Sequence, residues 1–210
     1  MANTGILGIV VALIIGGIGG YFVAGTSATP PQQKETSSDT NMPSTTMGSP
    51  LPTTATTEEK IANAMSAAPE NIAKEATVLD WPGSDGKMAE LKKGTNGWTC
   101  LPDYPASPGN DPLCGDGMTM QWFQAYMQHK PPKIAQSGIS YMLQGASDAS
   151  NEDPFAQTPP AGMDWMSAGP HIMVFPSGNL DEKLYGTTPG DKPWVMFAGT
   201  PYEHLMIPVK

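Results

Sequence analysis

Two histidines in this chain are each followed, two positions later, by a methionine. The pairs are His171–Met173 and His204–Met206, and each lies in a short apolar stretch bounded by Gly or Pro. In an extended strand alternate side chains share a face, so each histidine would point the same way as its methionine. Imidazole with thioether is a ligand set suited to copper, especially Cu(I). If the two strands are neighbours, all four side chains could converge on one copper site.

Packing is the other explanation for these pairs. The chain contains 14 methionines, and methionine is a routine filler of irregular cores. A sheet covered on both faces needs apolar residues on both faces, and Met173 and Met206 would meet that need. Some periplasmic copper carriers have the same His-x-Met pairing, and the chain resembles them in this pairing alone.

A serine hydrolase is the competing class of function. Residues 145–149 loosely match the Gly-x-Ser-x-Gly turn that carries a nucleophilic serine. Ser147 would be the nucleophile, and His171 or His204 would be the base. The nucleophile turn is normally followed directly by a helix, whereas residues 150–154 predict a turn. We therefore expect a non-enzymatic domain and keep the hydrolase as the alternative.

The charge balance argues against several classes of partner. The chain has 20 acidic residues against 11 basic ones, giving a net charge of -9, and no arginine occurs. Arginine is the usual bidentate partner of phosphates and base edges. The sequence also has no glycine-rich phosphate loop followed by Lys-Ser or Lys-Thr. We expect no binding of nucleic acid or nucleotide.

The first 25 residues predict a membrane segment. Residues 5–25 carry no charged side chain, which is about the length of helix that spans a bilayer core. The segment is either a retained anchor or a signal that is cleaved after Ala28. Small residues recur at every fourth position and could let a second membrane helix approach closely. These residues are Gly8, Ala12, Gly16, Gly20 and Ala24.

The next two parts of the chain predict a tether and a folded domain. Residues 26–57 are rich in Ser, Thr and Pro and poor in apolar side chains, which is typical of a flexible linker. Residues 58–210 are long enough for one domain with its own core. We expect this domain to lie outside the cytoplasm, in the periplasm or beyond the cell.

The two cysteines predict a disulfide. Cys100 and Cys114 flank a stretch that contains Pro102, Pro105 and other prolines. In an exported protein an even pair at this spacing favours a disulfide, and no Cys-x-x-Cys spacing suggests metal-binding thiolates.

Short apolar stretches predict an α+β domain with an antiparallel or mixed sheet. Thr57 should cap a helix that runs to about Ala68. A second helix should span residues 116–129 and pack through Met120, Phe123 and Met127. The expected strands are residues 77–81, 138–144, 170–175, 194–198 and 204–209.

Four sequence segments of the domain resemble an uncharacterised family of exported bacterial proteins. They are residues 61–69, 95–100, 141–145 and 199–206. The resemblance covers most of the domain and implies a bacterial origin and a single domain. It supplies no catalytic residue, because the family has no established activity.

Overall fold

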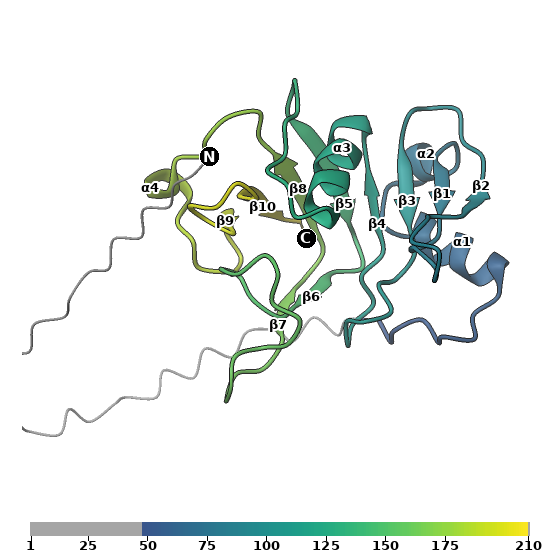
Figure 1. Ribbon diagram of the computed structural model, residues 1–210, viewed down its shortest axis with the longest axis horizontal. Helices are drawn as coiled ribbons and strands as arrows, with labels where there is room; N and C mark the ends of the chain where they lie inside the picture. Colours follow the sequence, from purple (N-terminus) through teal and green to yellow (C-terminus); the bar gives the residue numbers. More distant parts are fainter. Residues whose placement is uncertain (1–47, 210) are drawn as a thin grey trace, which may run out of the picture. The chain divides into compact units, whose positions relative to one another are not determined.

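The computed structural model describes residues 48–209, which belong to one compact unit (Figure 1). The predicted membrane segment 1–25, with its ridge of small residues, and residues 26–47 of the predicted tether lie outside this part. No helix within the described residues is long and apolar enough to cross a membrane.

One mixed sheet of eight strands organises the domain, in the order β2-β1-β3-β4-β5-β8-β10-β9. The predicted mixed sheet is therefore confirmed. Only β1 and β3 pair in parallel, whereas the other neighbours are antiparallel. The strands are β1 (Thr77–Leu79), β2 (Glu90–Lys92), β3 (Thr99–Leu101), β4 (Leu113–Gly115), β5 (Gly138–Met142), β8 (His171–Phe175), β9 (Trp194–Met196) and β10 (His204–Pro208). A second sheet pairs β6 (Ala146–Asp148) with β7 (Met166–Ala168).

Each of the five strands expected from the sequence is present, with ends that differ by a few residues. The strands that the sequence analysis did not predict are β2, β3, β4, β6 and β7. Each has only three residues. Three residues are too few to show alternation of apolar and polar side chains, and the equally short β1 and β9 were predicted because each lies in a longer apolar stretch.

The first helix, α1 (Thr57–Met65), is capped by Thr56 and not by Thr57 as predicted. The Thr56 hydroxyl accepts a hydrogen bond from the Glu59 backbone N–H at 3.2 Å. The Glu59 carboxylate accepts one from the Thr56 N–H at 2.7 Å. Glu59 can return this bond only to the residue three positions before it, which places the cap one residue earlier. Two short helices are α2 (Glu70–Ala73) and α4 (Glu182–Tyr185).

The longest helix, α3 (Gly117–Met127), confirms the predicted helix, and Met120 and Phe123 pack against the core as expected. Its buried side chains are Thr119 and Trp122, whereas Met127 is 39% exposed. The predicted contact through Met127 is wrong because α3 is rotated to seat Thr119 on the sheet. A Cβ added to Gly138 would lie 2.6 Å from the Thr119 backbone nitrogen, and one added to Gly115 would lie 2.6 Å from Thr119 Cγ2. The two glycines thus allow the helix to approach closely.

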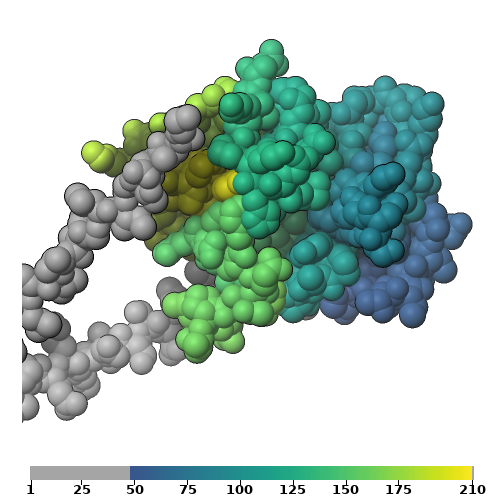
Figure 2. All heavy atoms as spheres, viewed as in Figure 1, coloured from purple at the N-terminus to yellow at the C-terminus, as the bar shows by residue number. Residues whose placement is uncertain are grey.

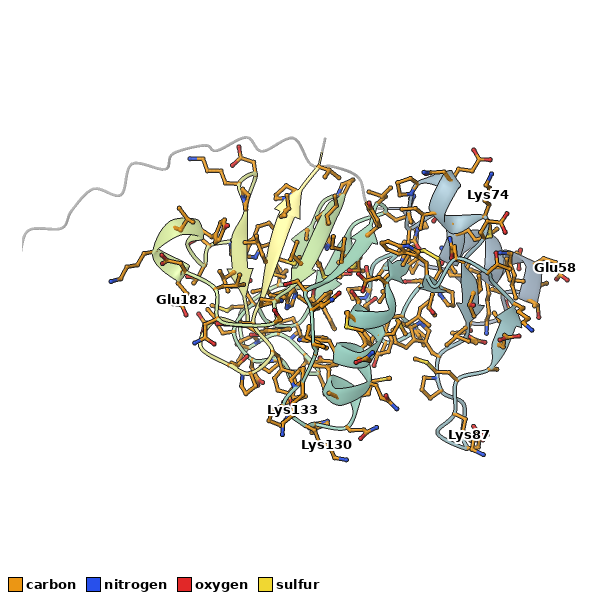
Figure 3. The ribbon with its side chains drawn as sticks, turned by 90° about the horizontal axis from the view of Figure 1, so that it is seen from above. Glu58, Lys74, Lys87, Lys130, Lys133 and Glu182 are labelled. Carbon is orange, nitrogen blue, oxygen red and sulfur yellow. A yellow bond between two sulfur atoms is a disulfide. The ribbon has the colours of Figure 1, made fainter. Side chains whose placement is uncertain are left out.

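Helices cover the sheet on both faces. The alanines of α1 and α2 pack with Val78, Cys100 and Cys114. Neighbouring residues in the same strands, such as Leu101 and Leu113, join Trp122 of α3 in a second cluster on the opposite face. Figure 2 shows α3 at the surface over the central strands. In the view from above, Lys130 and Lys133 beyond α3 lie on the other side of the sheet from Lys74 at the end of α2 (Figure 3).

The predicted disulfide is present between Cys100 and Cys114. The two residues are directly opposite each other in the β3–β4 ladder, with their Cα atoms 4.0 Å apart. Both are fully buried beneath α1. The cysteines therefore lie in strands, and the proline-containing segment between these strands is irregular.

The close approach of α3 leads to a first prediction. Gly138→Ala should lower the free energy of unfolding by about 2 kcal/mol, because the new methyl group meets helix backbone that has no room to yield. Gly117→Ala is the matched control, since nothing lies within 4 Å of its Cβ position in the first turn of α3. Thermal unfolding followed by circular dichroism measures both variants. Equal stability of the two would contradict this account of how α3 is seated.

Candidate histidine–methionine site

The two His-x-Met strands are neighbours, as the copper hypothesis requires. Strands β8 and β10 pair antiparallel, and Met173 lies directly opposite Met206. Alternation along each strand then places His171 and His204 on the same face as the methionines. All four residues are buried.

The register separates the two histidines along the strands. His171 is opposite Pro208, at the far end of β10 from His204. Four residues of strand correspond to about 13 Å, with the methionine pair between them. The two imidazoles therefore do not occupy neighbouring positions, and one ion at the His171 end would lie far from the His204 backbone.

Aromatic rings surround His204. Its imidazole stacks on Phe175 with 5.1 Å between ring centroids and meets the edges of Trp122 at 5.6 Å and Phe197 at 5.5 Å. Its Nδ1 is 3.0 Å from the carbonyl oxygen of Tyr202. Burial in this apolar setting lowers the pKa of His204 to about 4, so the ring is neutral at physiological pH.

His171 has the same backbone contact but different surroundings. Its Nδ1 is 2.7 Å from the carbonyl oxygen of Gly169. Because a carbonyl can only accept, Nδ1 carries the proton and Nε2 keeps its lone pair. Nε2 is buried and has no hydrogen-bond partner among the described residues. Burial also lowers the pKa of His171, which keeps the ring neutral.

Two further methionines on this face were not predicted as site residues. Met142 in β5 is directly opposite His171, and Met196 in β9 is directly opposite His204. Both are buried. Their contribution depends on strand order, which the sequence alone did not reveal. Within residues 48–209 no three His, Cys, Asp or Glu side chains form a metal-binding group. A metal site here would therefore draw mainly on thioethers.

Ser147, the nucleophile of the hydrolase alternative, lies in β6 and contacts a carboxylate. Its hydroxyl is 3.3 and 3.4 Å from the two carboxylate oxygens of Asp111, and its N–H donates to the same group at 3.0 Å. The Nδ1 atoms of His171 and His204 contact backbone carbonyls instead. Within the described residues no histidine is in hydrogen-bond contact with Ser147, so a Ser–His pair is not formed.

Asp111 interacts with two further carboxylates, those of Asp103 and Asp148. Asp103 accepts the Asp111 N–H at 2.8 Å and the Leu51 N–H at 2.7 Å, which holds the beginning of the described chain on the domain. Burial, with a smaller contribution from the charge of Asp103, raises the pKa of Asp111 to about 6. Burial and the nearby Asp111 raise the pKa of Asp148 to about 7.

Two open clefts lie on the described part of the domain. One of about 540 Å³ follows α1 and α2 and is lined by side chains such as Ile61, Met65 and Ala73. The other, of about 380 Å³, is lined by Trp122, Glu203 and nearby loops. Neither cleft includes a site residue that the sequence predicted.

Comparison of the chain with models of protein families, with characterised proteins and with solved structures finds no match.

The carboxylates lead to a prediction about pH. A raised pKa means that the folded protein holds a proton that the unfolded chain releases, so Asp148 favours folding at low pH. This contribution is lost as the pH rises through about 7. Asp148→Asn should therefore make the protein more stable than the native chain at about pH 8.5 and reduce the loss of stability between about pH 6.5 and 8.5.

Urea unfolding followed by tryptophan fluorescence tests this expectation. The buried histidines act in the opposite direction, because their lowered pKa values destabilise the fold as the pH falls below about 6.5. The chosen pH range avoids that effect. Asp164→Asn is the control, since Asp164 is exposed. Identical pH profiles for Asp148→Asn and the native chain would show that this carboxylate is not destabilised by burial.

Proposed function

We propose that this chain is a membrane-tethered extracytoplasmic binding protein, without catalytic activity, that holds copper as Cu(I). The observation that carries the proposal is the pairing of Met173 with Met206 across neighbouring strands, with a neutral histidine near each end of the pair. Two thioethers on one buried face supply soft sulfur ligands, and a neutral histidine at one end of the pair can supply an imidazole nitrogen.

The environment favours Cu(I) over divalent ions. A buried charge is costly unless its ligands compensate for it, and a monovalent ion carries the smaller charge. Within the described residues no three His, Cys, Asp or Glu side chains could hold a metal ion together, and no cysteine is free. Zn²⁺ is held mostly by thiolates, imidazoles and carboxylates, whereas neutral thioethers suit Cu(I).

The proposed location follows from the N-terminal sequence. Residues 5–25 have the length and composition of a membrane helix, and residues 26–47 would hold the domain away from the bilayer. The Cys100–Cys114 disulfide is compatible with an oxidising compartment. The small-residue ridge Gly8 to Ala24 would allow this helix to associate with another in the membrane.

Anaerobic titration of the full chain with Cu(I), in detergent and in competition with a chromophoric chelator, tests the proposal. We expect one tightly bound ion. Met173→Leu/Met206→Leu should weaken binding by more than about 100-fold, a larger loss than neighbours of metal ligands usually cause. Leucine keeps nearly the same volume, so the core should remain packed.

The control is Met88→Leu/Met120→Leu, because both methionines pack against the same core without belonging to the paired strands. This variant should bind as tightly as the native chain. Absence of binding by the native chain, or equal affinity of the two double variants, would contradict copper binding at the methionine pair.

A further inference from the structure

We infer that the metal lies at the His171 end of the face, bound by His171 Nε2 and by the thioethers of Met142, Met173 and Met206. This inference rests on the proposed function, which it makes specific. It adds a ligand from a third strand, β5, and removes His204 from the ligand set.

His171 Nε2 is a buried nitrogen with a free lone pair. The residue is 1% exposed, and this nitrogen has no partner among the described residues. Buried polar atoms are normally paired, so an exception needs an explanation. The bond from Nδ1–H to the Gly169 carbonyl fixes the ring and directs the free lone pair of Nε2. Metal-binding histidines commonly have this arrangement of one ring nitrogen on a carbonyl and the other on the metal.

The thioethers near that nitrogen come from three strands. Met142 is the cross-strand neighbour of His171, and such pairs have Cβ atoms about 4.5–5.5 Å apart. Met173 follows two residues later on the same face, with Met206 opposite it. Three soft thioethers and one imidazole, from β5, β8 and β10, give four neutral ligands that suit Cu(I).

Two other buried polar atoms on the same face of the sheet also lack hydrogen-bond partners within the described residues. Ser140 is opposite Met173, and its hydroxyl is also buried without a hydrogen-bond partner in the described part of the chain. The Thr119 hydroxyl is in the same state. Gly115 lies close to both side chains, because a Cβ built there would be 2.6 Å from Thr119 Cγ2 and 3.6 Å from Ser140 Cβ. Unpaired polar atoms thus gather in this part of the core.

His204 has different surroundings from His171. Three aromatic rings lie against its imidazole, and its Nε2 is not among the buried unpartnered atoms of the described residues. His204 therefore behaves as an aromatic core residue. Its cross-strand neighbour Met196 matches Met142 in type, burial and relation to a histidine. Substitutions of His204 and Met196 can therefore serve as matched controls for the same substitutions of His171 and Met142.

The experiment compares His171→Phe with His204→Phe, and Met142→Leu with Met196→Leu, in the full chain in detergent. Phenylalanine keeps a planar ring and removes both nitrogens. We expect His171→Phe to weaken Cu(I) binding by more than about 100-fold and Met142→Leu to weaken it measurably. His204→Phe and Met196→Leu should bind Cu(I) as the native chain does. Thermal unfolding of each variant shows whether it is folded.

A second measurement does not depend on variants that fold. In the native chain labelled with ¹³C at the methionine methyls, Ag(I) serves as a redox-inert substitute for Cu(I). We expect the methyl signals of Met142, Met173 and Met206 to shift together at one equivalent, while Met196 stays unchanged.

The inference would be overturned if Cu(I) binding were weakened by His204→Phe and Met196→Leu but not by His171→Phe and Met142→Leu. That result would leave the proposed copper binding intact. No binding of either ion would overturn both the inference and the proposed function. Shifts confined to exposed methionines such as Met127 and Met163 would also overturn the inference, because they would place the ion at the surface.

Discussion

The register of β8 between β5 and β10 determines which side chains share each face of the central sheet. Side chains alternate along a strand, so a slip of one residue would exchange the two faces. In the observed register Ile172 lies between Tyr141 and Ile207, and its neighbour Met173 lies between Ser140 and Met206. One face is therefore formed by side chains such as Tyr141, Ile172 and Ile207. The other collects the thioethers and imidazoles of three strands.

The rest of the domain follows the same division of faces. In β3 and β4 the cysteines face the alanines of α1 and α2, whereas Leu101 and Leu113 face the aromatic cluster. Small alanines let the short helices pack closely against the disulfide. On the opposite face Gly115 and Gly138 let Thr119 of α3 rest on the backbone, which brings Trp122 against Phe175 and His204. The aromatic surroundings of His204 are thus a consequence of how α3 is seated.

The sequence predicted the long apolar strands, both main helices and the disulfide, because each has a local pattern such as alternation, a capping residue or paired cysteines. It also predicted that His171 and His204 would face the same way as their methionines. It could not predict strand order, and strand order brings Met142 beside His171 and places the histidines at opposite ends of the methionine pair. The wrong prediction that Met127 packs against the core has a similar cause. Thr119 carries no apolar signal, yet its fit against two glycines from other segments sets the rotation of the helix.

The two buried histidines show why a shared motif need not mean a shared role. Both precede a methionine by two residues, both are held by a backbone carbonyl two residues earlier, and both have lowered pKa values because they are buried. Burial and hydrogen bonding therefore do not distinguish them. The difference lies at Nε2 and around the ring. His204 contacts Phe175, Trp122 and Phe197, and these aromatic contacts offset the free-energy cost of burying its imidazole without any ligand. His171 has none of these aromatic contacts within the described residues, and its buried nitrogen still lacks a partner. A soft ion held by that nitrogen and the adjacent thioethers would supply the missing interaction.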